Sequence, residues 1–110
     1  MAYDEDLADR IREAIQGQDG VAERRMFGGL AFLVNGNMAI SASSRGGLLV
    51  RVDPDETKAL VREAGVSRFA MRGREMDGWL HVEASATTAD SVVSAWVERG
   101  VAYARSLPAK

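Results

Sequence analysis

The stretch from residue 26 to residue 52 constrains the fold more than any other part of the chain. It reads MFGGLAFLVNGNMAISASSRGGLLVRV, with Asn35-Gly36 near its middle. Apolar residues recur at every second position on both sides of that pair, at Leu30, Phe32 and Val34 before it and at Met38, Ile40 and Ala42 after it. Such alternation around an Asn-Gly pair is the strongest short-range signal for a β-hairpin. The sequence therefore predicts two antiparallel strands joined by a tight turn.

Two neighbouring segments extend this hairpin. Gly46-Gly47 reverses the chain again before residues 48–52, so the simplest arrangement is a meander of three antiparallel strands. Residues 21–27 form a further strand in which Arg24 and Arg25 are adjacent, which predicts an edge or half-exposed position.

Gly28 and Gly29 allow two interpretations. The backbone amides of a diglycine can bind a phosphate, but a phosphate-binding loop opens a helix and often carries a Lys-Ser/Thr pair. Here a strand follows instead. We therefore expect the two glycines to serve a turn or bulge between neighbouring strands.

A helix is expected before and after the meander. Residues 7–16 have apolar side chains at helical spacing, and Gly17 closes this segment. Asp53 and Pro54 suit the N-cap and first helical position of a second helix, which we expect to run to Ala64.

Residues 66–84 predict a second hairpin, with its turn at Asp77-Gly78 and alternating apolar residues at Leu80 and Val82. A last helix then begins at Thr87 or Thr88. Its long apolar stripe is expected to pack on the core, with a homodimer contact as an alternative.

The last helix contains Gly100 and is stopped by Pro108. This glycine either allows another backbone to approach closely or marks a bend. Hairpins that build a sheet, with helices that cover it, make an α+β fold. We expect one domain over residues 1–110, with an antiparallel sheet of about five strands in the order α-β-β-β(-β)-α-β-β-α.

Composition excludes several classes of protein. The chain has no cysteine, so it can form neither a disulfide framework nor a thiolate metal site. The N-terminal residues lack the apolar segment of a secretory signal, and no run approaches the roughly 20 apolar residues of a membrane span. We therefore expect a cytoplasmic protein. The net charge of −2 argues against a wholly basic nucleic-acid binder.

The single histidine is the one candidate for catalysis. His81 and Glu83 would lie side by side on one strand face, where the histidine could act as a general base. However, the sequence has no cysteine nucleophile, no second histidine for zinc and no serine in a nucleophile elbow. A structural histidine is the favoured interpretation, so we assign no catalytic residue, metal or cofactor.

Together, these segments resemble the N-terminal domain of the TfoX/Sxy family, bacterial proteins tied to natural competence. The resemblance covers nearly the whole chain. It rests on Met26, Phe27, Gly28 and Gly29, on the Asn-Gly hairpin, on the strand at 48–52 that leads into an acidic helix start, and on MRGREMDGWLHV at residues 71–82.

The resemblance implies a compact α+β domain that acts as a regulator or co-activator through protein contacts. In that family, activation of competence genes is associated with the cyclic-AMP receptor protein at promoters. No catalytic residues are established for the family motif. Met26, Phe27, Gly28 and Gly29 therefore transfer only as signature positions with structural roles.

Three functions stay open. The first, which we favour, is a non-enzymatic interaction domain that binds another protein, such as a transcription factor. Its candidate surface comprises Arg24, Arg25, Arg72, Arg74, Trp79 and His81. The second is direct nucleic-acid binding through those arginines, with Phe69 or Trp79 as stacking platforms. The third is a small ligand-binding or enzymatic domain that uses His81 and Glu83.

Overall fold

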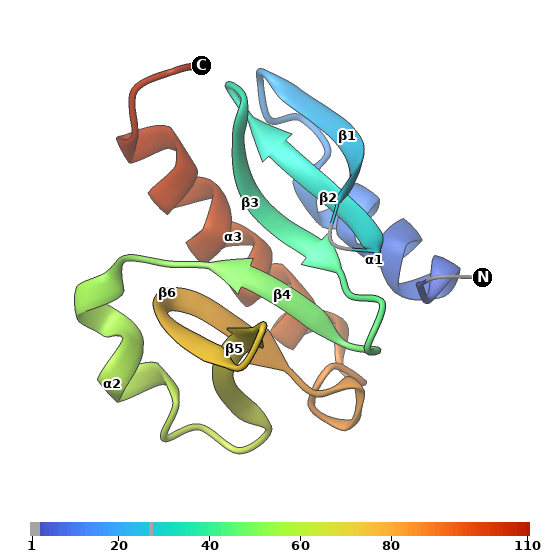
Figure 1. The fold of residues 1–110 in the computed structure, drawn as a ribbon. Helices are drawn as coiled ribbons and strands as arrows, with labels where there is room; N and C mark the ends of the chain where they lie inside the picture. The colour runs from blue at the N-terminus through green and yellow to red at the C-terminus, as the bar shows by residue number, and fades with distance from the viewer. Residues whose placement is uncertain (1–2, 27) are drawn as a thin grey trace.

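The computed structural model describes residues 3–26 and 28–110, with Met71 described by its backbone alone. Within these residues, six strands form one antiparallel sheet in the order β1-β2-β3-β4-β6-β5 (Figure 1). The elements are α1 (Glu5–Ile15), β1 (Val21–Met26), β2 (Gly29–Val34), β3 (Asn37–Ala42), β4 (Leu48–Arg51), α2 (Thr57–Leu60), β5 (Val66–Met71), β6 (Arg74–Val82) and α3 (Asp90–Ser106), with short 3-10 turns at Pro54–Glu56 and Ala84–Ala86. The predicted α+β class and element order are confirmed, with β1 as the additional strand.

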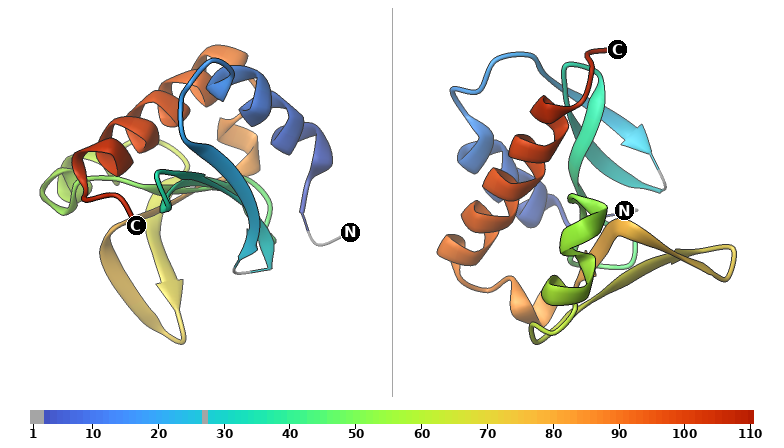
Figure 2. Two further views of the ribbon diagram at one scale, coloured as in Figure 1. Left: turned by 90° about the horizontal axis from the view of Figure 1, so that it is seen from above. Right: turned by 90° about the vertical axis from the view of Figure 1, so that its left-hand side faces the viewer.

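The main hydrophobic core lies between α1, α3 and one face of the sheet. Both helices pack on the same side of the sheet (Figure 2). Phe32, Ile40 and Leu80 point into this layer and are 0% exposed. Burying a side chain of this size stabilises the fold by about 1.5 to 3 kcal/mol, so this layer is a main source of stability. Within residues 3–26 and 28–110, no helix is both long and apolar enough to cross a bilayer.

α3 lies unusually close to the sheet at Gly100. A Cβ atom at this position would lie 2.5 Å from the backbone oxygen of Ala39 in β3. The glycine therefore allows a close backbone approach, one of its two predicted roles. The apolar stripe of α3 faces the protein's own core, where Trp96 is 6% exposed.

The meander follows the prediction. Asn35 and Gly36 have φ values of 52° and 84° between β2 and β3, as a two-residue hairpin turn with both central residues at positive φ requires. Gly46 and Gly47 belong to the connection from β3 to β4. β1 is an edge strand of the sheet, also as predicted.

The predicted turn of the second hairpin is wrong. The chain reverses at Arg72 and Gly73, which have φ values of 54° and 78°, and Asp77-Gly78 lies inside β6. The pairing of β5 with β6 is irregular there, so Gly78 occupies a bulge. The Gly78 amide donates to Thr57 Oγ1 at 2.8 Å, and its carbonyl accepts from the Val52 amide at 2.8 Å. These distant partners stabilise the bulge.

Predicted boundaries differ in all three helices. α1 spans Glu5–Ile15 and not residues 7–16, because Asp4 provides the N-cap. α2 ends at Leu60 and not at Ala64, which is exposed. Beyond Leu60, the amides of Arg62 and Glu63 bond to carbonyls only three residues back, so tight turns lead the chain into β5. Asp53 nevertheless caps the preceding turn as predicted, because its Oδ1 accepts from the Asp55 amide at 2.9 Å.

α3 begins later than predicted. Its N-cap residue is Ala89, which provides no side-chain hydrogen bond. Thr87 instead ends the preceding 3-10 turn, where its hydroxyl donates to the Ala84 carbonyl at 2.8 Å. That bond stabilises the 3-10 turn that precedes the helix.

A candidate interaction surface on the open face of the sheet

The sheet has a second hydrophobic cluster on the face opposite α1 and α3, which we call the open face. The buried members of this cluster are between 0% and 7% exposed and comprise Ala31, Leu33, Met38, Leu49 and Phe69. Met26, Met76 and Trp79 are partly buried against it. The β1–β2 and β5–β6 hairpins project on this side, away from α1 and α3 (Figure 2, left). The curved sheet thus buries the centre of the cluster and leaves a partly exposed apolar rim.

Two arginines are stacked on aromatic rings at this cluster. The guanidinium carbon of Arg45 lies 4.8 Å from the ring centroid of Phe69, and Arg45 Nη2 donates to the Ala70 carbonyl at 3.0 Å. The guanidinium carbon of Arg51 lies 5.0 Å from the ring of Trp79 and 5.6 Å from that of Tyr103. Cation–π contact attracts each guanidinium to its ring, so both charges are held close to the rim.

The four arginines expected from the sequence do not form one patch. In the β1–β2 register, Arg24 lies opposite Ala31 and Arg25 opposite Leu30. Because paired residues share a sheet face, Arg24 lies on the open face and Arg25 on the helix face. Arg72 and Arg74 are exposed at the tip of the β5–β6 hairpin.

Sequence reasoning missed Arg45 and Arg51. For Arg51 a signal exists, because it follows the buried Leu49 by two residues and shares its strand face. For Arg45 there is none, because it belongs to a turn, and its ring partner, Phe69, is distant in the sequence.

His81 lies on the open face, opposite Leu49 of β4. Its Nε2 is 2.8 Å from the Gly46 carbonyl, so the neutral ring can donate this bond in the tautomer protonated at that nitrogen. Glu83 is exposed beyond the end of β6, and its amide donates to the Gly65 carbonyl at 2.8 Å. This side-chain bond of His81 thus links β6 to the β3–β4 turn.

Among the signature positions, the two glycines act through the backbone. Met26 is at the rim of the open-face cluster, and Phe27 lies outside the described residues. Gly28 connects β1 to β2 with a φ of 77°. A side chain at Gly29 would overlap the backbone oxygen of Ala42 in β3, so this position places two strands in close contact.

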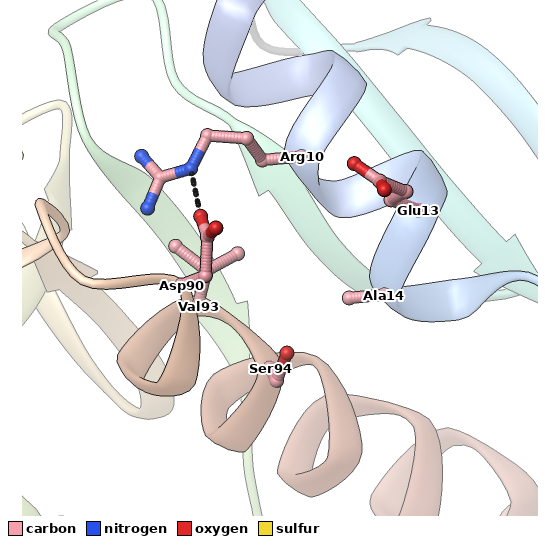
Figure 3. Close-up of a pocket in the computed structure, with 6 residues that line it drawn as sticks. All are labelled: Arg10, Glu13, Ala14, Asp90, Val93 and Ser94. Carbon is pink, nitrogen blue, oxygen red and sulfur yellow. Dashed lines mark hydrogen bonds and ion pairs between the residues drawn. The ribbon is translucent and has the colours of Figure 1, made fainter.

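Shallow cavities lie on the helix side. One, of about 230 Å³, lies between α1 and α3, and Arg10 Nε pairs across it with Asp90 Oδ1 at 2.8 Å (Figure 3). Another, of about 560 Å³, is lined by residues that include Asp53, Glu98 and Tyr103. A third, of about 200 Å³, borders the N-terminal half of α3. None of these is lined by His81 or Glu83. The described part of the chain contains no group of three or more His, Cys, Asp or Glu residues placed to hold a metal ion.

Comparison with known proteins identifies a family relationship. A family model described as the TfoX N-terminal domain matches residues 13–104. The matched range contains all six strands and most of α3. No curated protein and no solved structure matches the chain.

Proposed function

The chain belongs to the TfoX N-terminal domain family, and from this membership we propose that it is a non-enzymatic regulatory domain that binds a partner protein through the open face. The family resemblance favours a transcription factor as the partner and co-regulation of transcription as the role.

One observation carries this proposal. A hydrophobic cluster lies on a sheet face that α1 and α3 leave uncovered, with Met26, Met76 and Trp79 partly exposed around it. Apolar surface of this kind marks sites of protein contact. Methionine adapts its flexible, polarisable side chain to varied partner surfaces, and tryptophan is enriched where binding energy concentrates.

Two observations favour binding over catalysis at His81. Its Nε2 lies within hydrogen-bond distance of the Gly46 carbonyl. The carboxylate that could assist it belongs to Glu83, which is exposed outside the strand. A general base must lie within reach of a bound substrate, and the cavities described on the helix side are lined by residues other than His81.

Site-specific photo-crosslinking in the source organism tests the proposed surface. A benzophenone amino acid at position 76 places the crosslinker on the rim, and the same residue at position 98 places it on exposed α3 as a matched control. We expect position 76 to capture a distinct protein that position 98 does not, and Trp79→Ala to reduce that capture. Identical products from both positions, or none from position 76, would refute the proposal.

Transcript profiling tests the regulatory role. Met76→Glu places a charge on the apolar rim and should reproduce the transcript changes of a deletion strain. Glu98→Lys, on the opposite side of the protein, should leave transcripts as in the wild type. A deletion strain with unchanged transcripts would exclude transcriptional regulation.

A further inference from the structure

Acidic residues are almost absent from four of the six strands of the sheet. Strands β1 to β4 contain a single carboxylate, that of Glu23. Glu23 lies opposite Phe32 on the helix face, where Arg12 of α1 binds it. Within these four strands, the open face therefore has no negative charge.

Four arginines away from the open face pair with carboxylates, as Arg10–Asp90, Arg12–Glu23, Arg68–Asp77 and Arg99–Glu56. Arg25 of the helix face and Arg105 of α3 have no such pair among the described residues. Among the described residues, Arg24, Arg45 and Arg51 of the open face have no carboxylate partner within 4.0 Å. Three uncompensated positive charges thus lie around an apolar rim.

We infer that the open face binds an acidic segment of a partner protein, with carboxylates on Arg24, Arg45 and Arg51 and apolar side chains against Met26, Met76 and Trp79. This inference rests on the proposed function and specifies the chemistry of the partner. The planar guanidinium can donate two parallel hydrogen bonds to one carboxylate. Stacking on Phe69 and Trp79 orders two of these groups before binding, which lowers the entropy lost when the partner arrives.

The same contacts disfavour nucleic acid. A base would stack on an open aromatic face, but Phe69 is only 6% exposed and has Arg45 over its ring. Trp79 likewise has Arg51 over its ring. A phosphate backbone has no apolar group that could pack against Met26 and Met76. An acidic protein segment can also carry apolar side chains, which would cover them.

Fluorescence anisotropy with synthetic probes tests the inference on the full chain. The probes are a fluorescein-labelled peptide of alternating glutamate and leucine, the matching glutamine–leucine peptide, and a labelled oligothymidylate of similar length. We expect saturable binding of the glutamate peptide, at least about tenfold tighter than that of either other probe. Raising NaCl from about 0.01 to about 1 M shortens the Debye length from about 30 to about 3 Å and should largely abolish binding.

Arginine variants locate the contact. Arg24→Gln removes an exposed charge without a carboxylate partner and should weaken binding of the glutamate peptide about tenfold. Arg62→Gln is the matched control, because Arg62 is an exposed arginine without an ion pair in the turns after α2. Circular dichroism of both variants verifies the fold.

Four results would overturn the inference: no binding of the glutamate peptide at low salt, equal binding of the glutamine peptide, tighter binding of the oligothymidylate, or equal weakening by Arg62→Gln. These results are separable from the proposed function. If position 76 crosslinks a specific protein although the glutamate peptide does not bind, the open face is a protein-binding surface whose partner is not acidic.

Discussion

Arg12 of α1 donates two hydrogen bonds to Glu23 of β1, from Nε to Oε2 at 2.7 Å and from Nη2 to Oε1 at 2.8 Å. The bonds from Arg12 lower the pKa of Glu23 below its usual value, and the bond to Glu23 likewise raises the pKa of Arg12. Arg12 also donates to Asp9 at 2.6 Å. This contact joins the first helix to the edge strand of the sheet.

The Arg12–Glu23 pair predicts a pH dependence of stability. A lowered pKa in the folded state stabilises the fold above the unfolded pKa of about 4.3, and this contribution is lost as pH falls through the folded pKa. Because both side chains are more than a third exposed, Glu23→Gln should cost only about 0.5 to 1 kcal/mol at neutral pH.

Urea unfolding of wild type and Glu23→Gln, at neutral pH and in acid, measures this difference. It should disappear once Glu23 is protonated. Glu13→Gln changes an exposed glutamate of α1 that has no ion pair, and it should have little effect at either pH. A difference for Glu23→Gln that persists in acid would contradict the electrostatic explanation.

Gly100→Ala should destabilise the protein despite the better helix propensity of alanine. Propensity alone would favour alanine by about 1 kcal/mol, but the added Cβ would meet the backbone oxygen of Ala39. Forcing α3 away from β3 should cost about 1 to 3 kcal/mol. Thermal and urea unfolding measure the change in stability. Stabilisation by Gly100→Ala would show that α3 is free to move away from β3. Ala102→Gly, exposed on the same helix, calibrates the propensity term at about 1 kcal/mol.

Thr57→Val should destabilise the bulge in β6. Thr57 is 1% exposed, and its hydroxyl accepts the hydrogen bond from the Gly78 amide. Valine has nearly the same shape, so the main loss is the partner of a buried amide, which costs about 1 to 3 kcal/mol. Hydrogen exchange at Gly78 should accelerate in parallel. Thr88→Val, at an exposed position, should change stability by less than about 0.5 kcal/mol.

Arg45 and Phe69 should be energetically coupled. A double-mutant cycle with Arg45→Gln and Phe69→Leu isolates the cation–π contact at 4.8 Å and should give a coupling of about 0.5 to 1 kcal/mol. The cycle between Arg62→Gln and Phe69→Leu should be additive within about 0.5 kcal/mol. Equal coupling in both cycles would mean that Phe69→Leu perturbs the fold broadly.

Local patterns were sufficient for most of the fold. Alternating apolar residues identified the meander, and Asn35-Gly36 identified its first turn, because both signals act between near neighbours. For the second hairpin, local patterns left two possible positions for the turn. Arg72-Gly73 and Asp77-Gly78 both suit positive φ, and the hydrogen bonds that Gly78 donates to Thr57 and accepts from Val52 assign Gly78 to a bulge. Those partners are distant in the sequence.

The candidate site was less predictable than the fold. Alternation along β1 could separate Arg24 from Arg25, and Trp79 and His81 were correctly expected to share a strand face. The stacking of Arg45 on Phe69 depends on how the β3–β4 turn lies against β5, which no local pattern indicates.

The sequence by itself determined the order of helices and strands and which side chains share each strand face, because the period of two is a property of the extended backbone. Only the tertiary structure decided that α1 and α3 cover the same face and that unpaired arginines surround the apolar cluster on the other. The physical reason is that these contacts join residues distant in the chain, and their geometry depends on the strand order and curvature of the complete sheet.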